Sequence, residues 1–144
     1  MATEKTASAT WQGDLIHGSG RVTTGTGSVD TEMSWAARAE EVEGASPEEL
    51  IAAAHAVCVS MALSGALARE GTPPKRLESE ARTTFEKVGE GFGFTKVHLT
   101  IRGDVEGMDE DAFRRVAEEA KESCPVSKAL AGNVEISLDA SLVS

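Results

Sequence analysis

The sequence predicts an α+β fold, in which mainly antiparallel sheet packs on a long central helix. Residues 7–38, 76–105 and 134–142 contain runs that alternate apolar with polar side chains between turn residues, as half-buried strands do. Residues 46–69 and 109–123 carry helix signals instead. The resulting order is β-β-β-α-β-β-α-β, which lacks the regular strand–helix repeat of a parallel α/β sheet.

The first region, 7–38, is glycine-rich and predicts short strands separated by tight turns. We expect strands at 9–11, 21–24 and 29–35. Residues 40–44 follow as an acidic loop. The turns between the strands contain Gly18, Gly20, Gly25 and Gly27.

A strong helix start follows at residues 46–49, which read Ser-Pro-Glu-Glu. Ser46 can cap the helix, the proline after it fits the first helical position, and Glu49 completes a capping box. We expect the helix to end near Arg69, because Gly71 and two prolines follow.

Residues 50–68 of this helix carry no formal charge, so the segment approaches the length of a membrane span. However, a histidine, two serines, a glycine and many alanines lower its hydrophobicity. The segment is therefore interpreted as the buried central helix of a soluble protein.

The second half of the chain predicts a hairpin of two longer strands, at 76–88 and 92–105. The following helix, 109–123, has apolar residues along one face. Continuing this pattern by one turn reaches Cys124, so this cysteine should point inward. The proline after Cys124 disfavours helical geometry there and can open a short new turn at 126–131.

Composition limits the function classes. The chain of 144 residues and 15.1 kDa fits one domain, 1–144, because no linker divides it. A net charge of -10 argues against a nucleic-acid or anionic-membrane partner. The polar N-terminus lacks a secretory signal, which predicts a cytoplasmic location where structural disulfides are rare.

The two cysteines are therefore either plain core residues or a redox or catalytic set. Cys58 lies near the middle of the uncharged helix, where burial favours the thiol over the reactive thiolate. It is also about three turns from the helix start, too far for the helix dipole to help. Either Cys58 is packing, or a group elsewhere in the sequence ionises it.

An arginine is a suitable partner for a buried thiolate, because its guanidinium stays charged. Arg21 lies in a glycine-flanked turn and fits a solvated surface charge. Arg38 follows the apolar segment 35–37 and is better placed to reach a covered site. Glu48 can orient an arginine by a bidentate pair, or can simply compensate the helix dipole.

Helix geometry constrains how Glu48 and Cys58 act together. The two residues are about 15 Å apart along a straight helix, so one helix cannot easily bring both into one pocket. If both act in one site, Glu48 is expected to come from a second subunit, which predicts an active site at a homodimer interface.

Other combinations of residues are weaker. His55 shares a helix face with Cys58, but it is interpreted as a packing or hydrogen-bonding residue because no third residue orients it. Cys58, His55, Cys124 and His98 lack the spacing of a metal site. Two rival functions remain: a non-catalytic ligand-binding protein with inert cysteines, and a cysteine hydrolase that uses Cys58 and His55.

Two motifs carry a family resemblance. Residues 46–63, SPEELIAAAHAVCVSMAL, resemble the central helix motif of the OsmC/Ohr family of peroxidases, and residues 124–128, CPVSK, resemble its second motif in the same order. The similarity extends from the segment 11–14 to the last strand. The motif His-Ala-x-Cys at residues 55–58 and the segment 35–38 are similar to the OsmC branch rather than the Ohr branch.

The resemblance implies an intertwined homodimer with two interfacial sites and a thiol-dependent reductase of organic hydroperoxides. By position, Cys58 would be the peroxidatic cysteine and Cys124 the resolving one. Arg38 matches the activating arginine of the OsmC branch, and Glu48 matches the glutamate that holds it. The Ohr branch takes its arginine from the early glycine turn, where Arg21 is slightly displaced, so Arg21 is the alternative.

The implied cycle needs no cofactor and no metal. The Cys58 thiolate attacks an organic hydroperoxide, and Cys124 condenses with the resulting sulfenic acid to form an intramolecular disulfide. An external dithiol then restores both thiols. Family precedent implies a lipoyl-type dithiol, and an apolar pocket would favour alkyl or fatty-acid peroxides.

Overall fold

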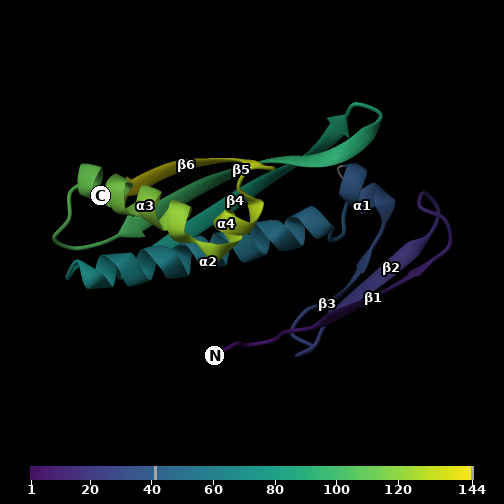
Figure 1. The fold of residues 1–144 in the computed structure, drawn as a ribbon, viewed down its shortest axis with the longest axis horizontal. Helices are drawn as coiled ribbons and strands as arrows, with labels where there is room; N and C mark the ends of the chain where they lie inside the picture. Colours follow the sequence, from purple (N-terminus) through teal and green to yellow (C-terminus); the bar gives the residue numbers. More distant parts are fainter. Residues whose placement is uncertain (41, 144) are drawn as a thin grey trace. The chain divides into compact units, whose positions relative to one another are not determined.

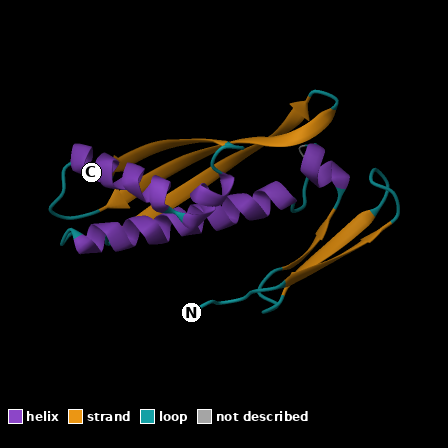
Figure 2. Ribbon diagram, in the orientation of Figure 1, coloured by secondary structure: helices purple, strands orange, loops and turns teal. Residues whose placement is uncertain are grey.

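A computed structural model describes residues 1–40 and 42–143, and its contacts divide the chain into two compact units, Met1–Leu50 and Ile51–Ser144. Figure 1 shows the course of the chain, and Figure 2 its helices and strands. Glu41, in the expected acidic loop 40–44, lies outside the described residues. Each unit is described separately below.

The first unit is a three-stranded antiparallel sheet in the order β1-β2-β3, followed by a short helix. Its elements are β1 (Ala7–Gln12), β2 (Ser19–Thr24), β3 (Asp30–Met33) and α1 (Trp35–Ala39). The expected strand 29–35 is wrong at its end, because Trp35 opens α1. Ser34 caps this helix by accepting the N–H of Ala37 at 3.1 Å, and alanine and arginine that follow are good helix formers.

The long helix α2 (Pro47–Arg69) begins at the end of the first unit and continues through the second. The predicted cap is present, since Ser46 Oγ accepts the N–H of Glu49 at 3.1 Å. By length and composition α2 is able to cross a membrane. However, Val59, Leu63 and Leu67 are fully buried in the protein core, which favours the interpretation as a core helix.

The second unit contains a sheet in the order β4-β5-β6 with the helices on one face (Figures 1 and 2). Its other elements are β4 (Arg76–Val88), β5 (Gly91–Asp104), α3 (Glu110–Ser123), α4 (Pro125–Leu130) and β6 (Glu135–Leu142). These bounds agree with the predicted ones to within a few residues. The fold class is confirmed as α+β.

One strand pair departs from the antiparallel expectation. β4 pairs with β5 antiparallel, but β6 pairs with β5 parallel, for example Leu138 beside Leu99. The helices α3 and α4 carry the chain back to the other end of the sheet before β6 begins, as a parallel pair requires. The sheet is therefore mixed.

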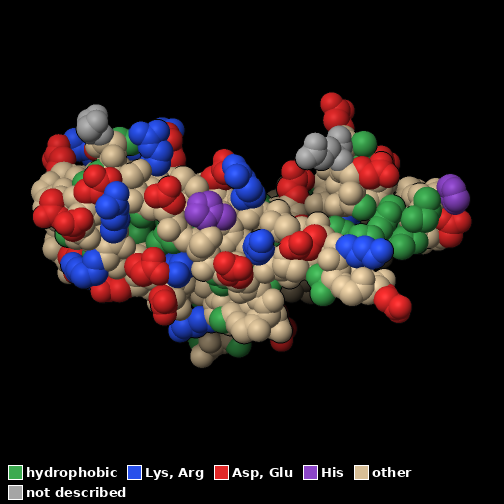
Figure 3. Space-filling model, turned by 90° about the horizontal axis from the view of Figure 1, so that it is seen from above, with side chains coloured by type: hydrophobic (Ala, Val, Ile, Leu, Met, Phe, Trp, Pro, Cys, Tyr) green, Lys and Arg blue, Asp and Glu red, His purple; other side chains and the backbone are tan. Residues whose placement is uncertain are grey.

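The core of the second unit lies between this sheet and the helices. Val97, Leu99 and Ile101 of β5 are fully buried, and Phe113 of α3 packs with them. Each such buried apolar side chain stabilises the fold by about 1.5–3 kcal/mol. Acidic and basic side chains are interspersed on the visible surface in Figure 3, as the scattered charges of the sequence predict.

Gly103 of β5 allows the Phe113 ring to lie directly against the strand. A methyl group at Gly103 would meet Phe113 Cζ at 2.5 Å and Leu77 Cδ2 at 3.2 Å. Because Phe113 is fully buried and cannot move freely, Gly103→Ala is expected to lower the free energy of unfolding by about 1–3 kcal/mol. Urea unfolding, followed by far-UV circular dichroism at one fixed protein concentration, measures this change.

Gly91→Ala is the matched control, because a methyl group there meets only Val88 O, at 3.9 Å. We expect this control to change the free energy of unfolding by less than about 0.5 kcal/mol. Equal unfolding midpoints for the two variants would show that the packing of the Phe113 ring does not require a glycine at position 103.

Candidate functional site

Cys58 and Cys124 meet inside the second unit. Cys58 is on α2 and partly buried, whereas Cys124 is fully buried between α3 and α4, where it is the N-cap of α4. Both are free thiols, and Cys58 packs against the buried cluster that contains Cys124. The inward orientation predicted for Cys124 is confirmed.

The two thiols differ in acidity. Burial raises the pKa of Cys58, and the hydrogen bond with Cys124 adds to this, although the N–H of Val126 acts in the opposite direction. Burial alone would raise the pKa of Cys124 as well, but hydrogen bonds from the Ser127 N–H, the Cys58 thiol and the Ser127 hydroxyl together lower it. Within this unit Cys124 is therefore the more acidic of the two thiols.

Any mechanism that uses Cys58 as the nucleophile must explain how the less acidic thiol becomes ionised. A thiolate at Cys58 needs a positive group from outside the cysteine pair, because burial opposes its ionisation. The uncharged sequence around Cys58 predicts the same requirement.

The predicted pair of Arg38 and Glu48 is present in the first unit. Arg38 Nε donates to Glu48 Oε1 at 2.9 Å, and Arg38 Nη2 donates to Glu48 Oε2 at 3.0 Å. This is a bidentate pair, which fixes the plane of the guanidinium. Arg38 comes from α1, and Glu48 from the first turn of α2. Glu48 is buried, whereas the Arg38 side chain is 35% exposed.

Arg21 has a different environment. Its Nε donates to Asp30 Oδ1 at 2.8 Å, Glu32 lies 3.8 Å from its Nη1, and its side chain is more than half exposed. Two carboxylates on the neighbouring strand therefore already balance its charge. Arg21 fits the surface interpretation, which leaves Arg38 as the better candidate for a thiolate partner.

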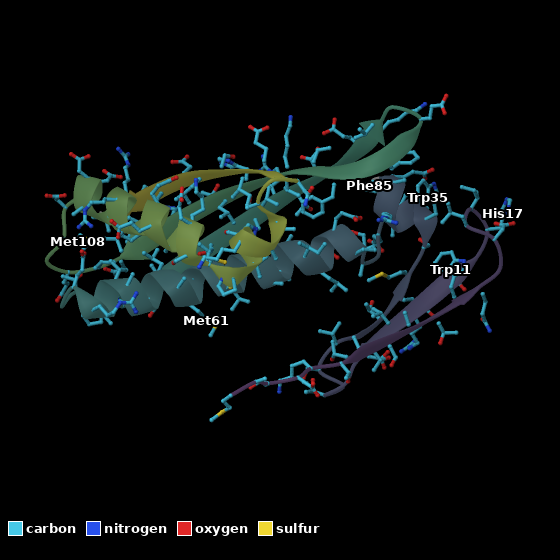
Figure 4. The ribbon with its side chains drawn as sticks, viewed as in Figure 1. Trp11, His17, Trp35, Met61, Phe85 and Met108 are labelled. Atoms are coloured by element: carbon cyan, nitrogen blue, oxygen red, sulfur yellow. The ribbon has the colours of Figure 1, made fainter. Side chains whose placement is uncertain are left out.

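A hollow of about 370 Å³ lies in the first unit and was not foreseen from the sequence. Its walls are mostly apolar and include Trp11, Met33 and Trp35, and both Arg21 and Arg38 contribute to the lining. Figure 4 labels the two tryptophans, which come from β1 and α1. Alternation within short strands does not reveal such a hollow, because it depends on where α1 turns back on the sheet. An apolar wall beside a guanidinium suits a small molecule with an apolar body and a polar end.

His55 is a hydrogen-bonding core residue, as predicted. It is fully buried, and its Nε2 lies 2.7 Å from Ser127 Oγ. Burial lowers its pKa, so the imidazole is neutral at pH 7. Ser127 was missed in the sequence analysis. Its position in the sequence could have indicated it. Ser127 is three residues after Cys124, so a helix that begins there places the serine hydroxyl near the helix start.

Comparisons with known proteins agree with the resemblance seen in the motifs. The family model described as OsmC-like protein matches residues 39–139. The chain is 39% identical over 145 residues to peroxiredoxin OsmC of Escherichia coli, covering 100% of both chains. It is 31% identical over 121 residues to the organic hydroperoxide resistance protein OhrB of Bacillus subtilis, covering 83% of this chain and 88% of that one.

A solved structure supports the fold. The crystal structure of an organic hydroperoxide resistance protein from Elizabethkingia anophelis superimposes with a TM-score of 0.78 at 26% identity, covering 99% of this chain and 100% of that one. The matched residues 39–139 include the cysteine pair and Glu48. On the family match and the full-length identity together, this chain belongs to the OsmC-like protein family.

Proposed function

We propose that this protein reduces organic hydroperoxides to alcohols, with Cys58 as the peroxidatic cysteine and Cys124 as the resolving cysteine. The observation that carries the proposal is the pair of free thiols in one core, with Cys124 at the start of α4 inside the buried cluster and Cys58 of α2 packed against that cluster. The names of the relatives, peroxiredoxin and organic hydroperoxide resistance protein, indicate peroxidase-type activity at the level of the family.

The proposed cycle balances without a metal or a bound cofactor. The Cys58 thiolate attacks one oxygen of the hydroperoxide, the O–O bond breaks, and the alkoxide takes a proton to leave as alcohol. Cys58 becomes a sulfenic acid, and Cys124 displaces its hydroxyl as water to form the disulfide. A dithiol, for which a lipoyl protein is our candidate, reduces the disulfide by exchange. We place this cycle in the cytoplasm.

We propose that Arg38, held by Glu48, supplies the positive group that Cys58 requires. Because Glu48 and Cys58 are about 15 Å apart along α2, the arginine of one chain is assigned to the cysteine of another, in a homodimer. Val57 and Met61 of α2 are 57% and 70% exposed, and Figure 4 shows Met61 on the side of the helix away from the sheet. An apolar surface beside Cys58 supports an interface there.

The hollow beside Arg38 supports an apolar peroxide as substrate. Its aromatic and aliphatic walls would hold the alkyl or aryl body, while the guanidinium attracts the peroxide end. We also propose that both units act as one domain, since the family match, residues 39–139, spans both.

The second candidate function is a non-catalytic ligand-binding protein, and the raised pKa of Cys58 favours it. A thiol that stays protonated does not attack peroxide, while the hollow would still bind an apolar ligand. The two candidates differ in what peroxide does to the free thiols.

Thiol titration after one equivalent of cumene hydroperoxide separates these functions. The peroxidase is expected to lose both thiols of each chain, and mass spectrometry of the digest should find an internal Cys58–Cys124 link. The binding protein keeps both thiols. Hydrogen peroxide at the same concentration is the control, and an apolar binding site predicts that it reacts more slowly than the organic peroxide.

A further inference from the structure

Two buried polar side chains lie beside the cysteine pair and have no part in the cycle described above. His55 of α2 is fully buried and Ser127 of α4 is 4% exposed, and His55 Nε2 lies 2.7 Å from Ser127 Oγ. Buried polar groups are costly unless they are paired, so this contact is a defined feature of the core.

The other ring nitrogen of His55 indicates the direction of the hydrogen bond. His55 Nδ1 is buried and has no hydrogen-bond partner among residues 1–40 and 42–143. A buried N–H without a partner is rarer than a buried acceptor without one. The neutral ring therefore carries its proton on Nε2, which donates to Ser127 Oγ, and Nδ1 is the unprotonated nitrogen.

Ser127 can then act as a hydrogen-bond donor toward Cys124. Its oxygen accepts from His55, so its own O–H is free to donate. Ser127 is buried in the first turn of α4, three residues after the buried N-cap Cys124, and its hydroxyl contributes to the lowered pKa of that thiol. The backbone N–H groups of Val126 and Ser127, in the first turn of α4, also contribute to the lowered pKa of Cys124. His55 therefore holds the Ser127 hydroxyl in the same turn of α4 that begins at Cys124.

No charged residue is needed for this arrangement. The titratable side chains that interact with Cys124 are Cys58, directly, and His55, through Ser127, and both lie on α2. Glu122 and Lys128, on α3 and α4, are exposed, and the partly buried Lys121 of α3 is ion-paired with Glu118. The favoured state of the Cys124 sulfur is therefore set by hydrogen bonds.

We propose that His55 and Ser127 are positioning residues for the resolving step, holding a hydroxyl donor on the Cys124 sulfur so that Cys124 attacks as a thiolate. This inference rests on the proposed two-cysteine function. In the step, the Cys124 sulfur forms a bond to the Cys58 sulfur, and the S–O bond of the sulfenic acid breaks. Hydroxide leaves and takes a proton to become water, so no other oxidant or reductant is needed.

The test separates the first step from the second in a single turnover. Reduced protein is mixed with one equivalent of cumene hydroperoxide, peroxide loss reports the first step, and disulfide formation, followed by mass after quenching, reports the second. Ser127→Ala is expected to leave peroxide loss within about twofold of wild type but to slow disulfide formation about tenfold, since one hydrogen bond is lost. The unresolved sulfenic acid should then be trapped by dimedone on Cys58.

Two further variants test the specific role of the hydroxyl. Ser127→Thr keeps the hydroxyl and is expected to restore most of the resolving rate. Ser60→Ala is the matched control, because Ser60 Oγ is also partly buried on α2 and bonds Ser79 Oγ at 2.6 Å. This control should resolve at the wild-type rate.

A titration tests the same inference without turnover. In a Cys58→Ser background, Cys124 is the one remaining thiol of the chain, so absorbance at 240 nm reports its thiolate. Adding Ser127→Ala is expected to raise the titration midpoint by about one pH unit, and adding Ser60→Ala should not move it.

The outcomes are distinct. If wild-type protein keeps both thiols in peroxide, the proposed function itself fails. If wild type forms the disulfide but Ser127→Ala forms it equally fast, or shows an unshifted midpoint, the positioning role is overturned. Slow resolution in both Ser127→Ala and Ser127→Thr, with no change of midpoint, would mean that Ser127 is needed only for packing, which also overturns the inference.

Discussion

Cys58→Ser is expected to lower the rate constant for cumene hydroperoxide reduction by at least about 10³-fold, because the hydroxyl of serine is not an effective nucleophile toward peroxide at neutral pH. The substitution replaces sulfur by oxygen at a partly buried position and leaves the apolar neighbours in place, so the fold should persist. Stopped-flow measurement of peroxide loss in a single turnover gives the rate directly.

Cys124→Ser is the informative comparison. It should consume one equivalent of peroxide at a rate near that of wild type, and then stop with a sulfenic acid on Cys58 that dimedone traps. The reverse pattern, with loss of the first step in Cys124→Ser and its survival in Cys58→Ser, would exchange the two roles. The comparison tests this exchange directly, since within the chain Cys124 is the thiol whose pKa is lowered.

Local sequence signals were sufficient where structure depends on nearby residues. The helix Pro47–Arg69 follows from its cap, its proline and the breakers after it, and the hairpin of β4 and β5 follows from alternation around a glycine turn. The same reasoning missed α1. Its five residues are too few to show helical periodicity, and the alternation of the strand before it continues into Trp35.

The parallel pairing of β6 was not predictable from its own alternation. Residues 135–142 alternate equally well in either direction, and the choice depends on where α3 and α4 carry the chain. The direction of a strand thus depends on the segment that connects it to its neighbour. Alternation within the strand contains no information about that direction.

In the candidate site, too, features that depend on nearby residues were predicted and features that depend on distant residues were missed. Glu48 was predicted to be able to orient an arginine by a bidentate pair, and the family resemblance indicated Arg38 as that arginine. The structure contains this pair. Ser127 was missed because its importance comes from His55, which is far away in sequence and close in the fold. The hollow beside Arg38 was missed for the same reason, since residues from several elements line it.

Arg38→Met is expected to lower the rate of peroxide reduction about 10²-fold at pH 7, because an adjacent positive charge lowers the pKa of a thiol by about 1–3 units. Methionine retains an unbranched apolar side chain but removes the charge and both hydrogen bonds to Glu48. Peroxide loss in a single turnover, measured from pH 5 to 10, should show recovery of much of the lost rate at high pH, where hydroxide ionises Cys58 without help.

Arg21→Met is the matched control for this charge. Arg21 lines the same hollow, but it is exposed and paired with Asp30, so its loss should change the rate by less than about threefold. A large effect of Arg21→Met together with a small effect of Arg38→Met would assign the activating role to the early glycine turn instead.

Mixed dimers test whether the arginine acts across subunits. Co-expression of Cys58→Ser with Arg38→Met should restore about a quarter of the wild-type activity, because half of the dimers formed at random contain one intact site of two. Each single variant alone should stay near background. Co-expression of Cys58→Ser with Cys124→Ser should restore no turnover, since the cysteine pair comes from one unit of one chain. If the first mixture also remains inactive while mass spectrometry finds mixed dimers, Arg38 serves the cysteine of its own chain. Arg38 would then have to leave Glu48 to reach Cys58, because about 15 Å of straight helix separates Glu48 from that cysteine.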